Sequence, residues 1–175
     1  HVEATHLKVT RQVLHWFEAE QPESFAPDRF PIFIWNWGGR EGEVFYGFPE
    51  LGSGLKVATE AHVACDPESV DRGVHPDETD TMYRRHIAGR LHGVSPRSRR
   101  VATCLYTEAP GARFWIDRLH DNGPIVVSAC SGHGFKHSAA IGEAVADWVI
   151  RGVRPQVLAP FAGPSPGISN PALGE

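Results

Sequence analysis

Residues 130–137, "CSGHGFKH", crowd two glycines, a serine, two histidines and a lysine where a strand-like run passes into a helix-like one. A glycine-rich turn at a helix N-terminus presents unpaired backbone N–H groups beside the positive end of the helix dipole, which favours anions. The motif is neither the phosphate loop GxxxxGK[ST] nor the nucleophile elbow GxSxG. The residues expected to form this anion-binding turn are Ser131, Gly132, His133, Gly134, Phe135 and Lys136.

Lysine is rare in this chain and is placed selectively. Only Lys8, Lys56 and Lys136 occur among 17 basic residues, and the last two stand in the glycine-flanked segments "GSGLKVA" and "GHGFKHS". Because a lysine ammonium is a compact, titratable point charge, unlike an arginine guanidinium, this placement indicates a functional site. The alternative is that both are ordinary exposed lysines near turns.

A second candidate segment is "CLYTEAPGARFWID", in which Cys104 and Tyr106 alternate to one face of a strand. An accessible thiolate on such a face is a nucleophile, whereas a buried strand cysteine is usually inert packing. With Cys65 and Cys130 the cysteines are odd in number and widely spaced, which indicates free thiols rather than disulfides or a metal knuckle.

A metal-dependent hydrolase is a rival interpretation of the turn. His133 and His137 are four residues apart and Glu143 follows, but a zinc site of this spacing needs both histidines on a regular helix, and His133 lies between two glycines. We therefore predict no metal. The other histidines are interpreted as surface or turn residues: His6, His15, His75, His86, His92 and His120.

Composition excludes several classes of protein. The 175 residues are 41% hydrophobic and 22% charged, which suits one substantial globular core. A formal net charge of −4 favours neither nucleic acid nor an anionic membrane as partner, and no apolar run approaches the roughly 20 residues of a membrane span. We expect a cytoplasmic protein.

The elements that must position these residues are mostly strands. Strand-like runs occupy 6–18, 30–37, 44–48, 55–62, 99–108, 113–119 and 124–130, the last three spaced as a meander, while 77–91 and 135–152 are helix-like. The pattern predicts an α+β fold: a mixed, largely antiparallel sheet, a flanking helix and a C-terminal strand-turn-helix. Predicted divisions are 1–98, 99–154 and an extended tail, 155–175.

Three motifs occur along the chain in this order: YGFP…GxGLK (46–56), CxYTxxPxxxFxID (104–117) and SGHGFK (131–136). This order resembles the C-terminal half of the monomeric sarcosine oxidase and N-methyltryptophan oxidase family, FAD-dependent amine oxidases of the D-amino-acid-oxidase type. The resemblance spans roughly residues 7–152. It implies oxidation of an N-methyl or other amino acid to an imine, with oxygen reduced to hydrogen peroxide.

The resemblance also assigns roles. It implies that Cys104 can carry FAD through a thioether, that Tyr106 lines the substrate site, that Lys136 binds the substrate carboxylate, and that Lys56 promotes reaction with oxygen. The backbone of 131–135 is expected to lie along the flavin. Glu60, where sarcosine oxidase has a histidine, would favour a substrate with a second basic group.

A dinucleotide-binding half is missing from this sequence. No strand is followed by GxGxxG and an acidic residue, the motif that holds the ADP part of FAD. We therefore expect the C-terminal portion of a longer oxidase, with the N-terminal FAD-binding half as its partner and without tight FAD binding of its own. The alternative is a non-catalytic fragment or interaction module.

Overall fold

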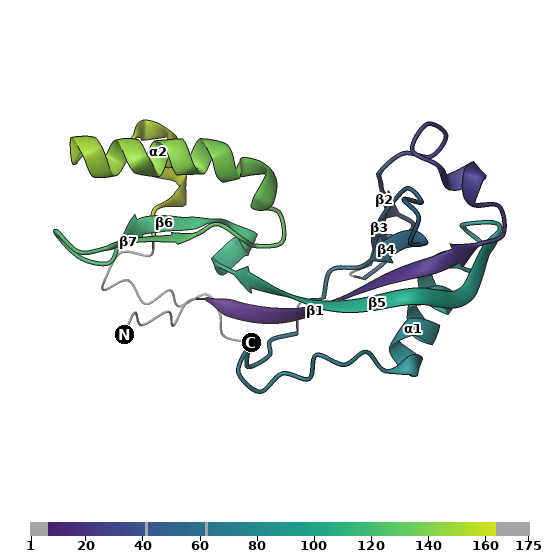
Figure 1. Cartoon of the computed structure of the whole chain (residues 1–175). Coiled ribbons are helices and arrows are strands. Elements are labelled where there is room, and N and C mark those ends of the chain that lie inside the picture. The colour runs from purple at the N-terminus through teal and green to yellow at the C-terminus, as the bar shows by residue number, and fades with distance from the viewer. Residues whose placement is uncertain (1–6, 41, 62, 164–175) are drawn as a thin grey trace. The chain divides into compact units, whose positions relative to one another are not determined.

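The computed structural model describes residues 7–40, 42–61 and 63–163. These residues form two compact units (Figure 1), one of residues 9–106 and the other of residues 107–163 with 7–8. Each unit has its own hydrophobic core.

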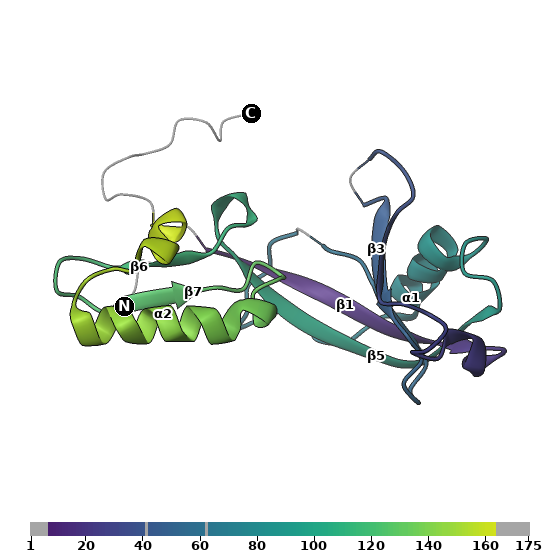
Figure 2. The same ribbon diagram turned by 90° about the horizontal axis from the view of Figure 1, so that it is seen from above.

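The unit of residues 9–106 is built on a five-stranded sheet of order β2-β3-β4-β1-β5, in which β1 and β5 run side by side (Figure 2). The β2–β3, β3–β4 and β4–β1 pairs are antiparallel. Trp16 and Phe48 both pair with Lys56, so these three side chains share one face of the sheet. The strands are β1 (Lys8–Ala19), β2 (Phe33–Asn36), β3 (Val44–Phe48), β4 (Leu55–Ala58) and β5 (Val94–Glu108).

The opposite face of this sheet carries the core. Strand β1 alternates, so that Phe17 and Ala19 are buried against helix α1 (Pro76–Met82) and the π-helical segment η2 (Tyr83–Ile87). Pro76 starts α1, where the missing N–H of proline costs no hydrogen bond. A short 3-10 helix, η1 (Pro22–Phe25), follows β1 and adds Phe25 to the same core.

The second unit is a strand pair covered by a helix. Strands β6 (Trp115–Arg118) and β7 (Ile125–Ser128) are antiparallel, and α2 (Ser138–Arg151) lies across them (Figure 1). Ile116 and Trp148 pack in its core beside Leu158. Three 3-10 segments complete the unit: η3 (Pro110–Ala112), η4 (Phe135–His137) and η5 (Gln156–Phe161).

The predicted α+β class and the largely antiparallel sheet are confirmed. Two expectations were wrong. Residues 99–108 form no meander with β6 and β7, because β5 pairs in the five-stranded sheet, and residues 156–161 are 3-10 helical rather than extended. Residues 164–175 of the expected tail, and His6, lie outside the described residues.

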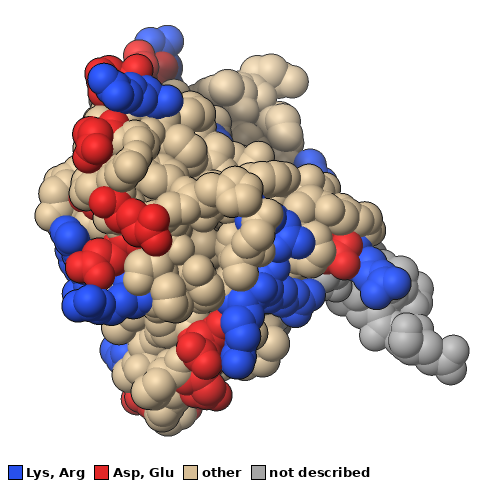
Figure 3. All heavy atoms as spheres, turned by 90° about the vertical axis from the view of Figure 1, so that its right-hand side faces the viewer, with Lys and Arg blue, Asp and Glu red and all other residues tan. Residues whose placement is uncertain are grey.

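No helix among the described residues is long and apolar enough to span a bilayer. On the face in Figure 3, basic and acidic side chains are interspersed with uncharged ones.

Candidate functional site

Lys56 lies on β4 between two aromatic rings. Its ammonium nitrogen is 4.8 Å from the ring centroid of Phe48 and 5.3 Å from that of Trp16, and within the described residues it makes no ion pair. A cation held over aromatic faces is positioned without being neutralised by a carboxylate. Lys56 can therefore act on a negative charge brought to this face.

The turn before Lys56 is fixed by backbone constraints. The Glu50 carboxylate accepts hydrogen bonds from the amides of Gly52 and Gly54, at 2.5 and 2.9 Å. Gly54 has φ +107°, and a Cβ there would lie 2.8 Å from the carbonyl oxygen of Phe17, so only glycine fits. The "GSG" turn thus ends directly before Leu55, the first residue of β4, and so fixes the position of Lys56 in that strand.

Tyr106 and Cys104 stand on β5, two residues apart, and thus on the same face of the strand. The hydroxyl of Tyr106 lies 3.3 Å from that of Tyr46 on β3, whose ring contacts Phe48 beside Lys56. Cys104 is exposed, so the alternative of an inert buried thiol is wrong.

Burial and hydrogen bonding decide the protonation of the two phenols. Burial, followed by the hydrogen bond to Tyr46, raises the pKa of Tyr106 far above its usual value. Burial also raises the pKa of Tyr46, although the hydrogen bond from Tyr106 acts in the opposite sense. The negative charge of Glu60 raises both pKa values further. At neutral pH both groups are neutral hydroxyls, able to donate a hydrogen bond but not to act as phenolate bases.

Sequence reasoning missed three members of this surface. The guanidinium of Arg100 lies 4.6 Å from the ring centroid of Trp16, so Trp16 contacts two cations. No local pattern marks Trp16 or Arg100, and Tyr46, although it opens the YGFP motif, has no role assigned from the sequence, because their contacts join strands far apart in the sequence. The surface is called the Lys56 face below and consists of Trp16, Tyr46, Phe48, Lys56, Arg100 and Tyr106.

The turn of residues 130–137 belongs to the second unit and is anchored by Ser131. The Ser131 hydroxyl donates to the carbonyl of Arg113 at 2.7 Å and accepts from the amide of Ala109 at 3.2 Å, and the Ser131 amide donates to Thr107 at 2.9 Å. The Ser131 side chain is therefore committed to holding the turn. Its predicted contribution to cofactor binding rests on the backbone.

The close approach of this turn to the preceding strand requires Gly134. A Cβ at Gly134 would lie 1.6 Å from the carbonyl oxygen of Ala129. The amides of His133 and Gly134 both donate to the carbonyl of Cys130, at 2.9 Å. These contacts close the turn directly before η4 and α2.

Three amides of the turn remain available. Among the described residues, the N–H groups of Gly132, Phe135 and Lys136 have no acceptor, as expected where a helix begins. Lys136 is exposed and makes no ion pair with a described residue, and the Phe135 side chain is 94% exposed. The turn thus offers free donors and a cation, the chemistry of an anion-binding site.

The histidines of the turn are exposed, and both contact the ring of Phe114. The rings of His133 and His137 lie 4.8 and 5.7 Å from that of Phe114, and His133 Nδ1 is 2.6 Å from the carbonyl oxygen of Ser131. In the part of the chain that the structure describes, no three His, Cys, Asp or Glu residues are grouped to hold a metal ion.

No family model matches the chain, but several known proteins are similar to it. It is 36% identical over 151 residues to the monomeric sarcosine oxidase of Streptomyces avermitilis, a match that covers 82% of this chain and 38% of that protein. It is 31% identical over 162 residues to the N-methyl-L-tryptophan oxidase of Salmonella arizonae, covering 86% of this chain and 40% of that protein.

Solved structures show the same fold. NikD, an amino acid oxidase essential for nikkomycin biosynthesis, superposes with a TM-score of 0.64 at 18% identity, over 90% of this chain and 42% of that one. Fructosyl amine:oxygen oxidoreductase (Amadoriase I) from Aspergillus fumigatus gives a TM-score of 0.57 at 19% identity, over 83% and 35%.

The chain therefore has the fold of part of these amino acid oxidases and is similar in sequence to part of the monomeric sarcosine oxidases. The predicted relationship to the monomeric sarcosine oxidases and N-methyl-L-tryptophan oxidases is confirmed. The chain spans about two fifths of the length of these relatives, which is consistent with a fragment of a longer oxidase.

Proposed function

We propose that this chain is the C-terminal portion of an FAD-dependent oxidase that converts an N-methyl or other amino acid to an imine, with oxygen reduced to hydrogen peroxide. The sequence relationship to sarcosine and N-methyltryptophan oxidases carries the proposal. The exposed thiol of Cys104, on the same face of β5 as Tyr106, supports it. A cytoplasmic location is proposed with it, supported by three free cysteines.

The residues present fit the flavin portion of FAD. Free amides at Gly132, Phe135 and Lys136 are suited to negative charge on the pyrimidine edge of the ring, where aligned donors contribute a few kcal/mol each. Cys104 is accessible for a thioether link. When bound, FAD would accept two electrons from the substrate and pass them to oxygen. The ADP-binding motif remains absent from the sequence, so the adenine end requires the N-terminal half.

Lysines and a tyrosine are assigned to the substrate and oxygen. The exposed ammonium of Lys136 is proposed to bind the substrate carboxylate. Lys56, uncompensated by any described carboxylate, would stabilise the negative charge that develops as oxygen is reduced. Tyr106, a neutral phenol at physiological pH whose hydroxyl shares a hydrogen bond with Tyr46, would line the substrate site.

Glu60 bears on the choice of substrate. It is exposed, and its negative charge acts on the hydroxyls of Tyr46 and Tyr106. A carboxylate close enough to act on both hydroxyls would attract a cationic group of the substrate and repel a second acidic group. We therefore propose a substrate with a basic group in addition to its reacting amine.

The test is flavin retention after acid denaturation of the longer protein that contains this chain. Flavin fluorescence should remain with the polypeptide, should be lost in Cys104→Ser, and should persist in the matched variant Cys130→Ser. The 175-residue chain alone should not be yellow. Loss of flavin in both variants would contradict attachment through Cys104. A flavin-loaded isolated chain would contradict the need for the N-terminal half.

A further inference from the structure

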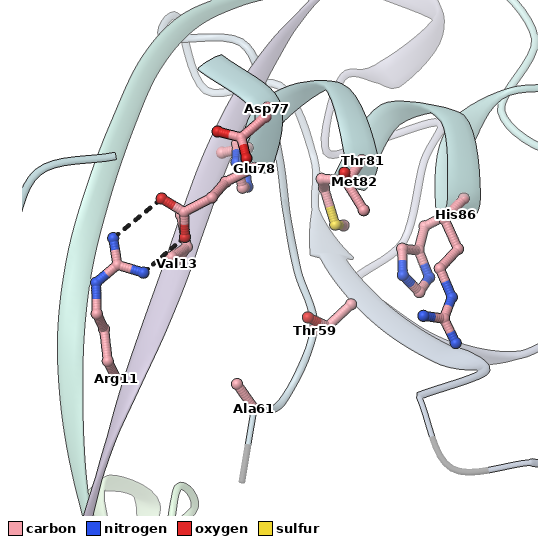
Figure 4. Close-up of a pocket in the computed structure, with 11 residues that line it drawn as sticks. Arg11, Val13, Thr59, Ala61, Asp77, Glu78, Thr81, Met82 and His86 are labelled. Atoms are coloured by element: carbon pink, nitrogen blue, oxygen red, sulfur yellow. Dashed lines mark hydrogen bonds and ion pairs between the residues drawn. The ribbon is translucent and has the colours of Figure 1, made fainter. Parts of the chain in front are cut away.

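A pocket lies on the core side of the five-stranded sheet, between β1 and the helical segments α1 and η2 (Figure 4). It has a volume of about 350 Å³ and is contained within the unit of residues 9–106. His15 on β1 lines it, next to Trp16 of the Lys56 face. Because adjacent residues of a strand point to opposite faces, this pocket is separated from the Lys56 face by the sheet.

His15 is a buried polar side chain without a partner. It is only 2% exposed, it stacks on Phe17 at 5.6 Å, and neither ring nitrogen has a hydrogen-bond partner within the described residues. Burial lowers the pKa of His15 to about 4, against the opposing influence of Glu78, so the imidazole is neutral. A buried ring with one donor and one acceptor unused is unfavourable unless a bound molecule satisfies it.

Some of the charged residues around the pocket form an ion pair with each other, and others have no ion pair with a described residue. The guanidinium of Arg11 and the carboxylate of Glu78 form a bidentate pair, with a shortest N–O distance of 2.6 Å (Figure 4). Asp77 and Arg85 also line the pocket but make no ion pair with a described residue. One negative and one positive charge are therefore available, on residues whose backbones would lie about 12 Å apart along an α-helix of 1.5 Å rise per residue. The π-helical η2 shortens this separation.

The remaining lining supports an extended ligand. Thr59 and Thr81 supply hydroxyl groups, while Val13 and Met82 supply apolar surface between the two charged ends. His86 also lines the pocket. Its Nδ1 accepts from the indole N–H of Trp37 at 3.3 Å, so its Nε2 carries the proton.

We propose that this pocket binds a small extended zwitterion, of the class of short peptides and ω-amino acids, with its ammonium at Asp77, its carboxylate at Arg85 and its middle beside His15. The balanced charge of the lining disfavours simple anions and simple amines, which would leave one end unpaired. The single α-carbon of glycine is too short to reach both ends. The site does not depend on the proposed oxidase function, and binding is measured without flavin or turnover.

The experiment is an NMR titration of the full chain with 6-aminohexanoate, hexanoate and hexylamine, observed at the His15 ring, which the variant His15→Gln identifies. The zwitterion should shift the His15 resonance saturably and bind at least tenfold more tightly than either single-charge probe. Equal binding of all three, or an unmoved His15 resonance, would overturn the proposal in favour of a water-filled pocket.

Variants at exposed residues provide a test that does not depend on whether His15→Gln folds. Asp77→Asn should abolish the preference for the zwitterion over hexanoate, and Arg85→Gln its preference over hexylamine. Asp80→Asn and Arg84→Gln are matched controls, because these residues pair with each other at 3.3 Å on the same helical segment and do not line the pocket. Equal effects of test and control variants would reject a specific site.

Discussion

The hydroxyl oxygens of Tyr46 and Tyr106 lie 3.3 Å apart, which joins β3 and β5 across the Lys56 face. Burial raises the pKa of both phenols, but the shared hydrogen bond raises the pKa of Tyr106 and lowers that of Tyr46. Tyr46 is thus the first of the pair to ionise, with Tyr106 as its donor.

This order can be measured, since the chain has only three tyrosines. In Tyr106→Phe, Tyr46 loses its donor and should ionise at higher pH than in the unmodified chain. In Tyr46→Phe, Tyr106 should ionise at lower pH, because the hydrogen bond to Tyr46 no longer raises its pKa, while burial and the charges of Glu60 and Cys104 remain. Phenolate absorbance during an alkaline titration reports both changes. If the pKa of the remaining tyrosine of the pair is the same in each variant as in the unmodified chain, the two hydroxyls do not interact.

Trp16 should couple energetically to Lys56. A cation over an aromatic ring at a partly exposed site contributes about 0.5–1 kcal/mol. A double-mutant cycle of Trp16→Leu and Lys56→Met, measured by urea unfolding, should therefore give a coupling free energy of that size. The control cycle pairs Lys56→Met with Trp35→Leu, since Trp35 stacks on Phe45 rather than on a cation, and should give none. A coupling equal in both cycles would contradict the cation–π contact.

Gly134→Ala should destabilise the unit of residues 107–163. The added Cβ would lie 1.6 Å from a backbone oxygen of Ala129, and the turn would have to shift, at a cost above about 2 kcal/mol. The control is Gly142→Ala in α2, where nothing lies within 4 Å of the new Cβ. There the helix propensity of alanine should add roughly 0.5–1 kcal/mol. Thermal unfolding distinguishes the two, and equal midpoints would refute the close approach.

Acidification should destabilise the unit of residues 9–106 through two histidines. Burial lowers the pKa of both His15 and His86 to about 4, with a further contribution to His86 from Arg85 and Arg90. Between pH 6.5 and 4 the unfolded chain binds protons that the folded chain does not, so stability falls as the pH falls. Each histidine contributes about 1.4 kcal/mol per pH unit.

Urea unfolding at several pH values in this range tests the effect. The variant His15→Leu should show a shallower loss of stability on acidification, by about 1.4 kcal/mol per pH unit. The carboxylates are the same in the variant and in the unmodified chain. Their contributions to the pH dependence of stability therefore cancel in the difference between the two proteins. Parallel stability profiles for the two proteins would mean that His15 is not held neutral by the fold.

Local patterns predicted the strands and the turn well, because alternation, glycine and helix-start signals are short-range. They located 44–48 and the start of β4 correctly, and placed Cys104 and Tyr106 on one face. They failed for β5, since hydrophobic runs identify a strand but not its neighbour in the sheet.

The same limit applies to the sites. Trp16 and Arg100 meet on the Lys56 face only after strands distant in sequence are paired. His15 and His86 were expected at the surface or in turns, yet both are buried, because α1 and η2 cover that side of the sheet. The predicted division at residues 98 and 154 and the role of each turn residue stay predictions.

Strand β1 places His15 and Trp16, neighbours in the sequence, in two separate environments. An insertion or deletion of a single residue before them would exchange these environments, with an indole forced into the pocket and an imidazole beside two cations. In protein engineering, lengths should therefore be varied in the turn around residues 120–123 and not in this strand.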